Sequence, residues 1–168
     1  GERSLLDDSS QGYGDAKRGL EQDNFLVDTF NSATSDAATL TNCSVLVVAG
    51  PTQELTLPEQ EMVAGYLAER GKALFLLDPD APESFRVLLG PWGVRLGRGT
   101  IIDPQSRPEP TTPVVDQRLL TEVTGLTSIT TALDTVFFPR ATSVDVLVDE
   151  NIPGPVAAYQ IFLATNPL

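Results

Sequence analysis

Apolar residues gather in two short, uninterrupted runs, Val45 to Ala49 and Ala73 to Leu77, each followed by a turn that contains proline. Runs of this length without polar alternation are typical of strands buried on both faces of a parallel sheet. Residues 58–70, between them, carry apolar side chains at helical spacing. Strand, helix and strand in this order predict a βαβ unit, with the two strands parallel and adjacent or nearly so at the centre of the sheet.

The predicted helix over 58–70 has start and stop signals at both ends. Thr56 and Glu59 fit a capping box, and Pro58 stands in the first turn, where its missing N–H costs nothing. Gly71 follows the last turn and is expected to adopt the left-handed conformation of a helix C-cap. The apolar stripe expected to lie on the sheet comprises Met62, Val63, Tyr66 and Leu67.

The patterns before the first apolar run are weaker. Asp15 is expected to cap a helix that runs through Gln22, with Leu20 on its inner side. Asn24 should end this helix, and residues 25–30 are predicted to form a strand.

The helices and strands predicted outside the βαβ unit are indicated only by short sequence patterns. Leu40 is the clear apolar anchor of a segment rich in Ser, Thr and Ala, and Pro82 is expected to open a helix through Leu89. The remaining predictions are a stop at 90–94, a long proline-containing loop over 104–118, a helical turn over 129–133, and strands over 100–103, 136–138, 144–148 and 158–164.

The length of 168 residues fits one ordinary domain, and 41% apolar residues fit a globular core. We expect a single α/β domain over 1–148, followed by an extension over 149–168 that leads out of it. The longest apolar runs are about five residues, far short of the roughly 20 that a membrane helix needs.

The chain is strongly acidic, with 23 Asp and Glu against 11 Lys and Arg, for a net charge of −12. Phosphate backbones would be repelled, so we expect no nucleic-acid partner. The charge is most simply explained by solubility, and a cation or a basic partner surface is the alternative.

The chain contains no histidine, which excludes Ser-His-Asp and Cys-His catalysis and histidine metal ligands. Cys43 precedes its strand, whereas the nucleophile of an elbow follows one. Neither a P-loop nor a G-x-G-x-x-G run is present. The sequence therefore predicts no enzyme, no catalytic residue and no cofactor.

Candidate ligand-binding residues lie where the predicted strands end, because ligands of parallel α/β sheets bind beyond the carboxyl ends of the strands. They are Gly50, Pro51, Thr52, Asp78, Asp80 and Asp103. The three carboxylates are expected to form an acidic rim for a hard cation, a sugar or an amine, with the metal left open. The alternative is ordinary Asp-Pro turn chemistry, with Asp80 capping the next helix.

Several segments, in the same order, resemble the auxiliary domain of ABC-type transport systems. This is the gliding-motility auxiliary-component family, related to the N-terminal domain of an intraflagellar transport protein. The resemblance covers residues 1–148. The matching segments are Gly1 to Ser4, Leu20-Glu21, Val45 to Pro51, Tyr66 to Gly71, Leu74 to Pro79, Leu88-Leu89, Trp92 to Val94, Ile101 to Asp103, Ser128 to Thr130 and Phe138 to Ala141.

The resemblance implies a three-layer, mainly parallel α/β fold that is flavodoxin-like or like a class I glutamine amidotransferase. It implies a noncatalytic soluble domain outside the cytoplasm, periplasmic or at the cell surface, in an accessory subunit that binds a partner protein or exported ligand. The full-length protein would be membrane-anchored and would partner the permease and ATPase subunits. The alternative is a carbohydrate- or divalent-metal-binding module that uses the acidic loops.

Two departures from the family pattern matter. Family members carry a strand and a histidine before the Gly-Glu pair, so an excised piece of a longer protein is expected. Ser128 stands where the family has a second histidine. A site built from those histidines is therefore not expected in this chain.

Overall fold

The structure is a computed structural model of the chain, and it describes residues 5–9, 12–32, 34–104, 106, 109–116 and 134–146. The chain divides into two compact units, which are described separately. Unit 1 comprises Gly1–Leu77 and Ala81–Leu88, and unit 2 comprises Asp78–Asp80 and Leu89–Leu168. The predictions for 129–133, 147–148, 158–164, Ser128 and the extension over 149–168 lie outside the described residues.

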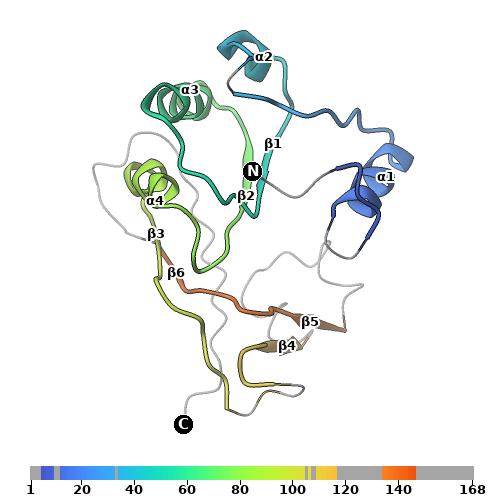
Figure 1. Cartoon of the computed structure of the whole chain (residues 1–168), viewed down its shortest axis with the longest axis vertical. Helices are drawn as coiled ribbons and strands as arrows, with labels where there is room; N and C mark the ends of the chain where they lie inside the picture. Colours follow the sequence, from blue (N-terminus) through green and yellow to red (C-terminus); the bar gives the residue numbers. More distant parts are fainter. Residues whose placement is uncertain are drawn as a thin grey trace. The chain divides into compact units, whose positions relative to one another are not determined.

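The predicted βαβ arrangement is present in unit 1 (Figure 1). Strand β1 (Leu46–Ala49), helix α3 (Leu57–Ala68) and strand β2 (Ala73–Leu76) follow one another, and β1 pairs with β2 in parallel. The register places Leu46 opposite Ala73 and continues to Ala49 opposite Leu76. The parallel, adjacent placement of these strands and the helix between them are thus confirmed.

The expectation that both faces of these strands are buried is wrong. Val47, Leu74 and Leu76 are 48%, 49% and 50% exposed. In the part of the chain that the structure describes, β1 and β2 form a two-stranded sheet, so nothing there places them at the centre of a larger one. Each apolar run therefore has one buried face and one exposed face. The three-layer, mainly parallel fold is not confirmed.

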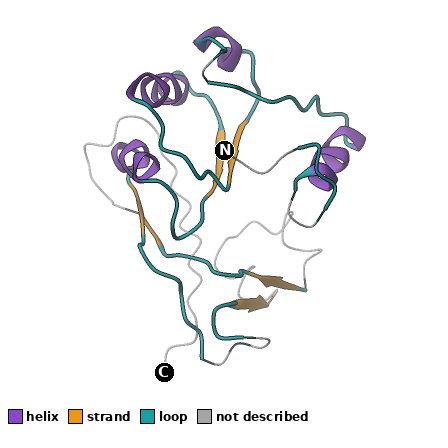
Figure 2. Cartoon of the chain, in the orientation of Figure 1, coloured by secondary structure: helices purple, strands orange, loops and turns teal. Residues whose placement is uncertain are grey.

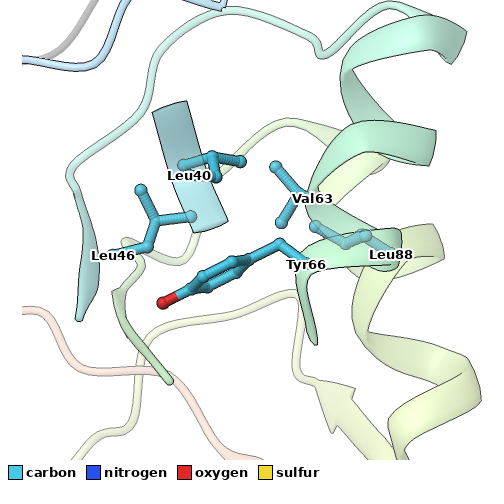
Figure 3. Close-up of a cluster of buried hydrophobic side chains, with 5 residues drawn as sticks. All are labelled: Leu40, Leu46, Val63, Tyr66 and Leu88. Atoms are coloured by element: carbon cyan, nitrogen blue, oxygen red, sulfur yellow. The ribbon is translucent and has the colours of Figure 1, made fainter. Parts of the chain in front are cut away.

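The core of unit 1 lies between α3 and the other face of the β1–β2 pair (Figure 3). Leu40, Leu46, Val63, Tyr66 and Leu88 form its buried cluster, and Leu40 is 1% exposed. Complete burial of such a leucine contributes about 1.5–3 kcal/mol. The apolar stripe of α3 and the anchor at Leu40 are confirmed, because Met62 and Leu67 pack against the same cluster.

Helix α3 begins one residue before the predicted Pro58 and ends at Ala68, two residues before the predicted Arg70. The Thr56 N–H donates to Glu59 Oε2 at 2.7 Å within the capping box, and Pro58 lies in the first turn. At the other end Arg70, with φ 69°, is the left-handed residue, so the prediction for Gly71 is wrong. The Gly71 N–H donates to the Tyr66 carbonyl at 2.9 Å, and the Arg70 N–H donates to the Leu67 carbonyl at 3.1 Å. This is a Schellman motif, in which Arg70 occupies the position that glycine usually takes.

Helix α1 (Gly14–Gln22) confirms the predicted early helix, and Asn24 ends it with φ 64°. Asp15 lies in its first turn and is not the N-cap, a position that Tyr13 holds, and Leu20 is 43% exposed. The expectations that Asp15 caps this helix and that Leu20 lies on its inner side are therefore wrong.

Residues 25–30 form no strand, and Leu26 is 96% exposed. Among the described residues, no strand pairs with this segment. A short helix, α2 (Ala37–Thr41), was not predicted, although the Asp36 side chain accepts a hydrogen bond from the Thr39 N–H at 3.1 Å. Five residues are too few to show a helical period.

Helix α4 (Glu83–Leu89) confirms the helix expected after Pro82. The turn η1 (Gly90–Trp92) ends it, and Gly93 takes a left-handed φ of 74°.

Unit 2 contains two antiparallel strand pairs (Figure 2). Strand β3 (Val94–Leu96) pairs with β6 (Val144–Val146), and β4 (Val114–Asp116) pairs with β5 (Thr135–Phe137). The strands predicted near 136–138 and 144–148 are confirmed within the described residues. Residues 100–103 form no strand, and β4 falls in the expected long loop. Mixed helices and small sheets make the chain an α/β protein.

Candidate functional site

The turn after β1 offers little for a ligand to bind. Gly50 takes φ 57°, and its N–H donates to the Leu76 carbonyl at 2.9 Å. Pro51 is buried and has no N–H, and Thr52 is exposed. Because the first two residues present no backbone donor to a ligand, this turn is not the phosphate or oxyanion cradle that opens many α/β sites.

The loop beyond this turn is held to the start of α4 by Glu54. Its Oε1 accepts a hydrogen bond from the Glu83 N–H at 3.0 Å, and its Oε2 accepts one from the Ser84 N–H at 2.7 Å. In return, the Ser84 hydroxyl accepts a hydrogen bond from the Leu55 N–H at 2.9 Å. Hydrogen bonding by Ser84, supported by the Glu83 N–H and the charge of Arg86, holds the pKa of Glu54 below its ordinary value.

Glu54 therefore fills the role proposed for Asp80. The carboxylate that receives the first amides of α4 comes from 29 positions earlier in the chain. The helix N-terminus carries a partial positive charge, which favours a carboxylate there. Sequence reasoning missed Glu54, because no local spacing links it to Pro82.

The predicted acidic residues lie on two turns of unit 2. Asp78 and Asp80 are exposed on the turn after β2. Asp103 is half-buried; its N–H donates to the Pro110 carbonyl at 2.8 Å, and its carbonyl accepts from the Ser106 N–H at 3.0 Å. Among the described residues, no group of three or more His, Cys, Asp or Glu is arranged to hold a metal ion. Gly50, Pro51 and Thr52 belong to unit 1.

Cys43 lies before β1, at the end of the strand opposite the Gly50 turn. Its side chain is exposed, and its Sγ donates to the Val45 carbonyl at 3.1 Å. The position matches the sequence expectation that this thiol does not stand on an elbow after the strand.

A small cavity lies instead at the carboxyl end of α3, where no site was predicted. Its volume is about 160 Å³. The Tyr66 hydroxyl borders it, donating to the Lys72 carbonyl at 2.9 Å and accepting from the Lys72 N–H at 3.0 Å. The lining residues are Thr41, Cys43, Ser44, Tyr66, Glu69, Arg70, Gly71 and Lys72. The one sequence signal for it is a basic residue on each side of Gly71.

Comparison with known proteins shows the fold and nothing finer. No protein-family model matches the chain, and no curated protein matches it. A solved structure titled "mmIFT52 N-terminal domain" is similar, with a TM-score of 0.61 and 17% sequence identity. The match covers 79% of this chain and 60% of that one, so the chain spans about three fifths of the length of the solved domain. The similarity to the IFT52 domain agrees with the expected relation to an intraflagellar transport protein. Membership of the gliding-motility family is not supported, because no family model matches.

Among the described residues, no helix combines the length and the apolar character needed to cross a bilayer.

Proposed function

We propose that the chain is a noncatalytic domain of an accessory subunit of an ABC-type transport system, and that it binds a partner protein or exported ligand outside the cytoplasm. Two lines of support agree. Several sequence segments over residues 1–148 resemble that family in the same order along the chain, and the fold is similar to the N-terminal domain of IFT52. The permease and ATPase subunits would be the partners of the full-length, membrane-anchored protein.

The geometry around β1 carries the noncatalytic part of the proposal. Amidotransferase-like chemistry needs a nucleophile on the turn after the strand and a histidine base beside it. In this chain the turn is Gly50-Pro51-Thr52, the cysteine lies at the opposite end of β1, and histidine is absent. Pro51 has no N–H and the Gly50 N–H is bonded to the Leu76 carbonyl, so neither of them can stabilise an oxyanion.

The described residues give no support to the alternative of a divalent-metal module. Such a site would need several carboxylates around one point, and no group of this kind is found among them. Partner binding therefore remains the better-supported function.

Co-purification tests the proposal directly. The full-length protein is expressed with the ATPase and permease encoded beside its gene, and a tag on the permease is used for purification. We expect stoichiometric co-elution in size-exclusion chromatography, retained in the Cys43→Ser variant. A gene neighbourhood without these subunits, or separate elution of the accessory protein, would contradict the proposal.

A further inference from the structure

The lining of the cavity at the end of α3 includes two exposed cations that have no acidic partner among the described residues. In the described part of the chain, Lys17, Arg18, Arg86 and Arg95 each form an ion pair with a carboxylate. Arg70 and Lys72, which line the cavity, form none there. Arg140 likewise forms no ion pair among the described residues, so what distinguishes Arg70 and Lys72 is that two such cations line one cavity.

Arg70 also occupies a backbone conformation that costs stability. Its φ of 69° lies in the left-handed region, where a Cβ crowds the following carbonyl oxygen. Glycine is the usual residue at this position of a Schellman motif. Strained residues of this kind gather at sites that bind ligands. An arginine at this position is therefore a reason to look for a role of its side chain.

Capping of the helix end by hydrogen bonds does not require either cation. The negative end of the α3 dipole favours basic side chains nearby. However, the Tyr66 and Leu67 carbonyls already accept hydrogen bonds from the Gly71 and Arg70 N–H groups. The guanidinium and ammonium groups are thus not needed to satisfy these two carbonyls.

Tyr66 holds this part of the chain in place. Its ring belongs to the buried cluster, and Figure 3 shows its hydroxyl oxygen at the end of the ring farther from Val63 and Leu88. The hydroxyl bonds both the N–H and the carbonyl of Lys72, which fixes the Lys72 backbone at the cavity wall. A fixed backbone at this position lowers the entropy lost when a ligand binds, although the long side chains themselves must still be ordered.

We propose that this cavity binds a small oxyanion, a carboxylate or a phosphate group, through Arg70 and Lys72. The volume of about 160 Å³ is roughly ten times the ~10–15 Å³ that a cavity needs, on the same measure, to hold one water molecule. A guanidinium fork matches the two oxygens of such a group, and an ammonium adds a second charge. Glu69 reduces the lining charge to +1, which balances a single negative charge.

Anion titrations test this site. The folded chain is titrated with sodium acetate and with sodium phosphate, against sodium chloride at the same ionic strength, and followed by melting temperature and amide chemical shifts. We expect acetate or phosphate to shift the amides of residues 69–72 beyond the chloride effect. A response to acetate alone, phosphate alone or both supports the site and assigns its anion. Equal behaviour in all three salts overturns it.

Variants separate a ligand-binding role from a structural one. Arg70→Gly should raise the melting temperature by roughly 1–3 °C, because it relieves the strain, and yet abolish the anion response. Arg140→Gly is the matched control, since Arg140 is exposed in unit 2 with φ 53°. The Arg140→Gly variant should also gain stability, but its amides at 69–72 should still respond to the anion. Lys72→Met should weaken the response at least threefold with the backbone conformation unchanged. An anion response that survives in Arg70→Gly overturns the proposal.

Discussion

Gly71 lies against the ring of Tyr66 so closely that a Cβ atom on Gly71 would fall 2.5 Å from ring atoms Cε1 and Cζ and 2.5 Å from the Tyr66 carbonyl oxygen. The ring is 8% exposed and its hydroxyl is bonded to Lys72, so it cannot move aside cheaply. The carbonyl belongs to the helix backbone and is fixed by the Gly71 N–H. Glycine is thus required here by close approach and not by a left-handed φ.

Gly71→Ala should lower the free energy of unfolding by about 1–3 kcal/mol, the range found when atoms are forced into a packed site. Urea denaturation measures the difference. Gly65→Ala is the control, because a Cβ there meets nothing within 4 Å and the residue lies inside α3. It should gain about 0.5–1 kcal/mol. Equal effects at the two positions would show that the Tyr66 contact does not form in solution.

Amide hydrogen exchange should alternate along β1. The N–H groups of Leu46 and Gly50 donate to the Lys72 and Leu76 carbonyls at 2.8 and 2.9 Å, so they should exchange slowly. Successive residues of a strand point their amides to opposite edges, so the Val47 amide points away from β2 and should exchange faster. Slow exchange at Val47 as well would mean that another strand covers this edge of the sheet.

Local signals accounted for the βαβ unit. Thr56, Glu59 and Pro58 marked the start of α3, and the apolar spacing of its inner face marked its buried side. These signals act within one or two turns and do not depend on the rest of the fold. The end of the helix was predicted to within two residues. Its left-handed residue was misplaced at Gly71, because the preference for glycine there comes from a contact with the Tyr66 ring that only the fold reveals.

The pairing of strands that lie far apart in the sequence could not be predicted from the sequence. Strand β3 pairs with β6 across about 50 positions, and its three residues are too few to show alternation. Conversely, Phe25 and Leu26 have side chains typical of strands but are exposed, and no strand among the described residues pairs with them. The cavity was missed for the same reason, since Thr41 and Arg70 come together only when α2 and α3 pack.

Cys43→Ser should leave the fold unchanged, and neither the wild type nor the variant should hydrolyse glutamine, esters or nucleotides. The thiol is exposed and its hydrogen bond to the Val45 carbonyl is one that a serine hydroxyl can also make. The assays are glutaminase, esterase and nucleotidase turnover at matched protein concentration. A turnover that disappears in Cys43→Ser would overturn the noncatalytic proposal.

Glu54→Gln should destabilise the chain at neutral pH and have less effect in acid. The hydrogen bonds from Ser84 and Glu83 favour the charged carboxylate, so its pKa in the folded state lies below the ordinary value of 4.5. Because the folded pKa is the lower one, the stabilisation is complete well above pH 4.5 and is lost as the pH falls through the folded pKa.

Melting temperatures of wild type and Glu54→Gln between pH 7 and pH 3 measure this dependence. The difference in melting temperature between the two proteins should be largest near pH 7 and should decrease steadily below pH 4.5. Glu61→Gln is the matched control, because Glu61 is an exposed carboxylate on α3 that makes no hydrogen bond or ion pair among the described residues. The melting temperature of Glu61→Gln should stay close to that of the wild type at every pH. A constant difference for Glu54→Gln would mean that the carboxylate does not cap α4, and the hydrogen bond from the Leu55 N–H to the Ser84 hydroxyl would then hold the loop after β1 without it.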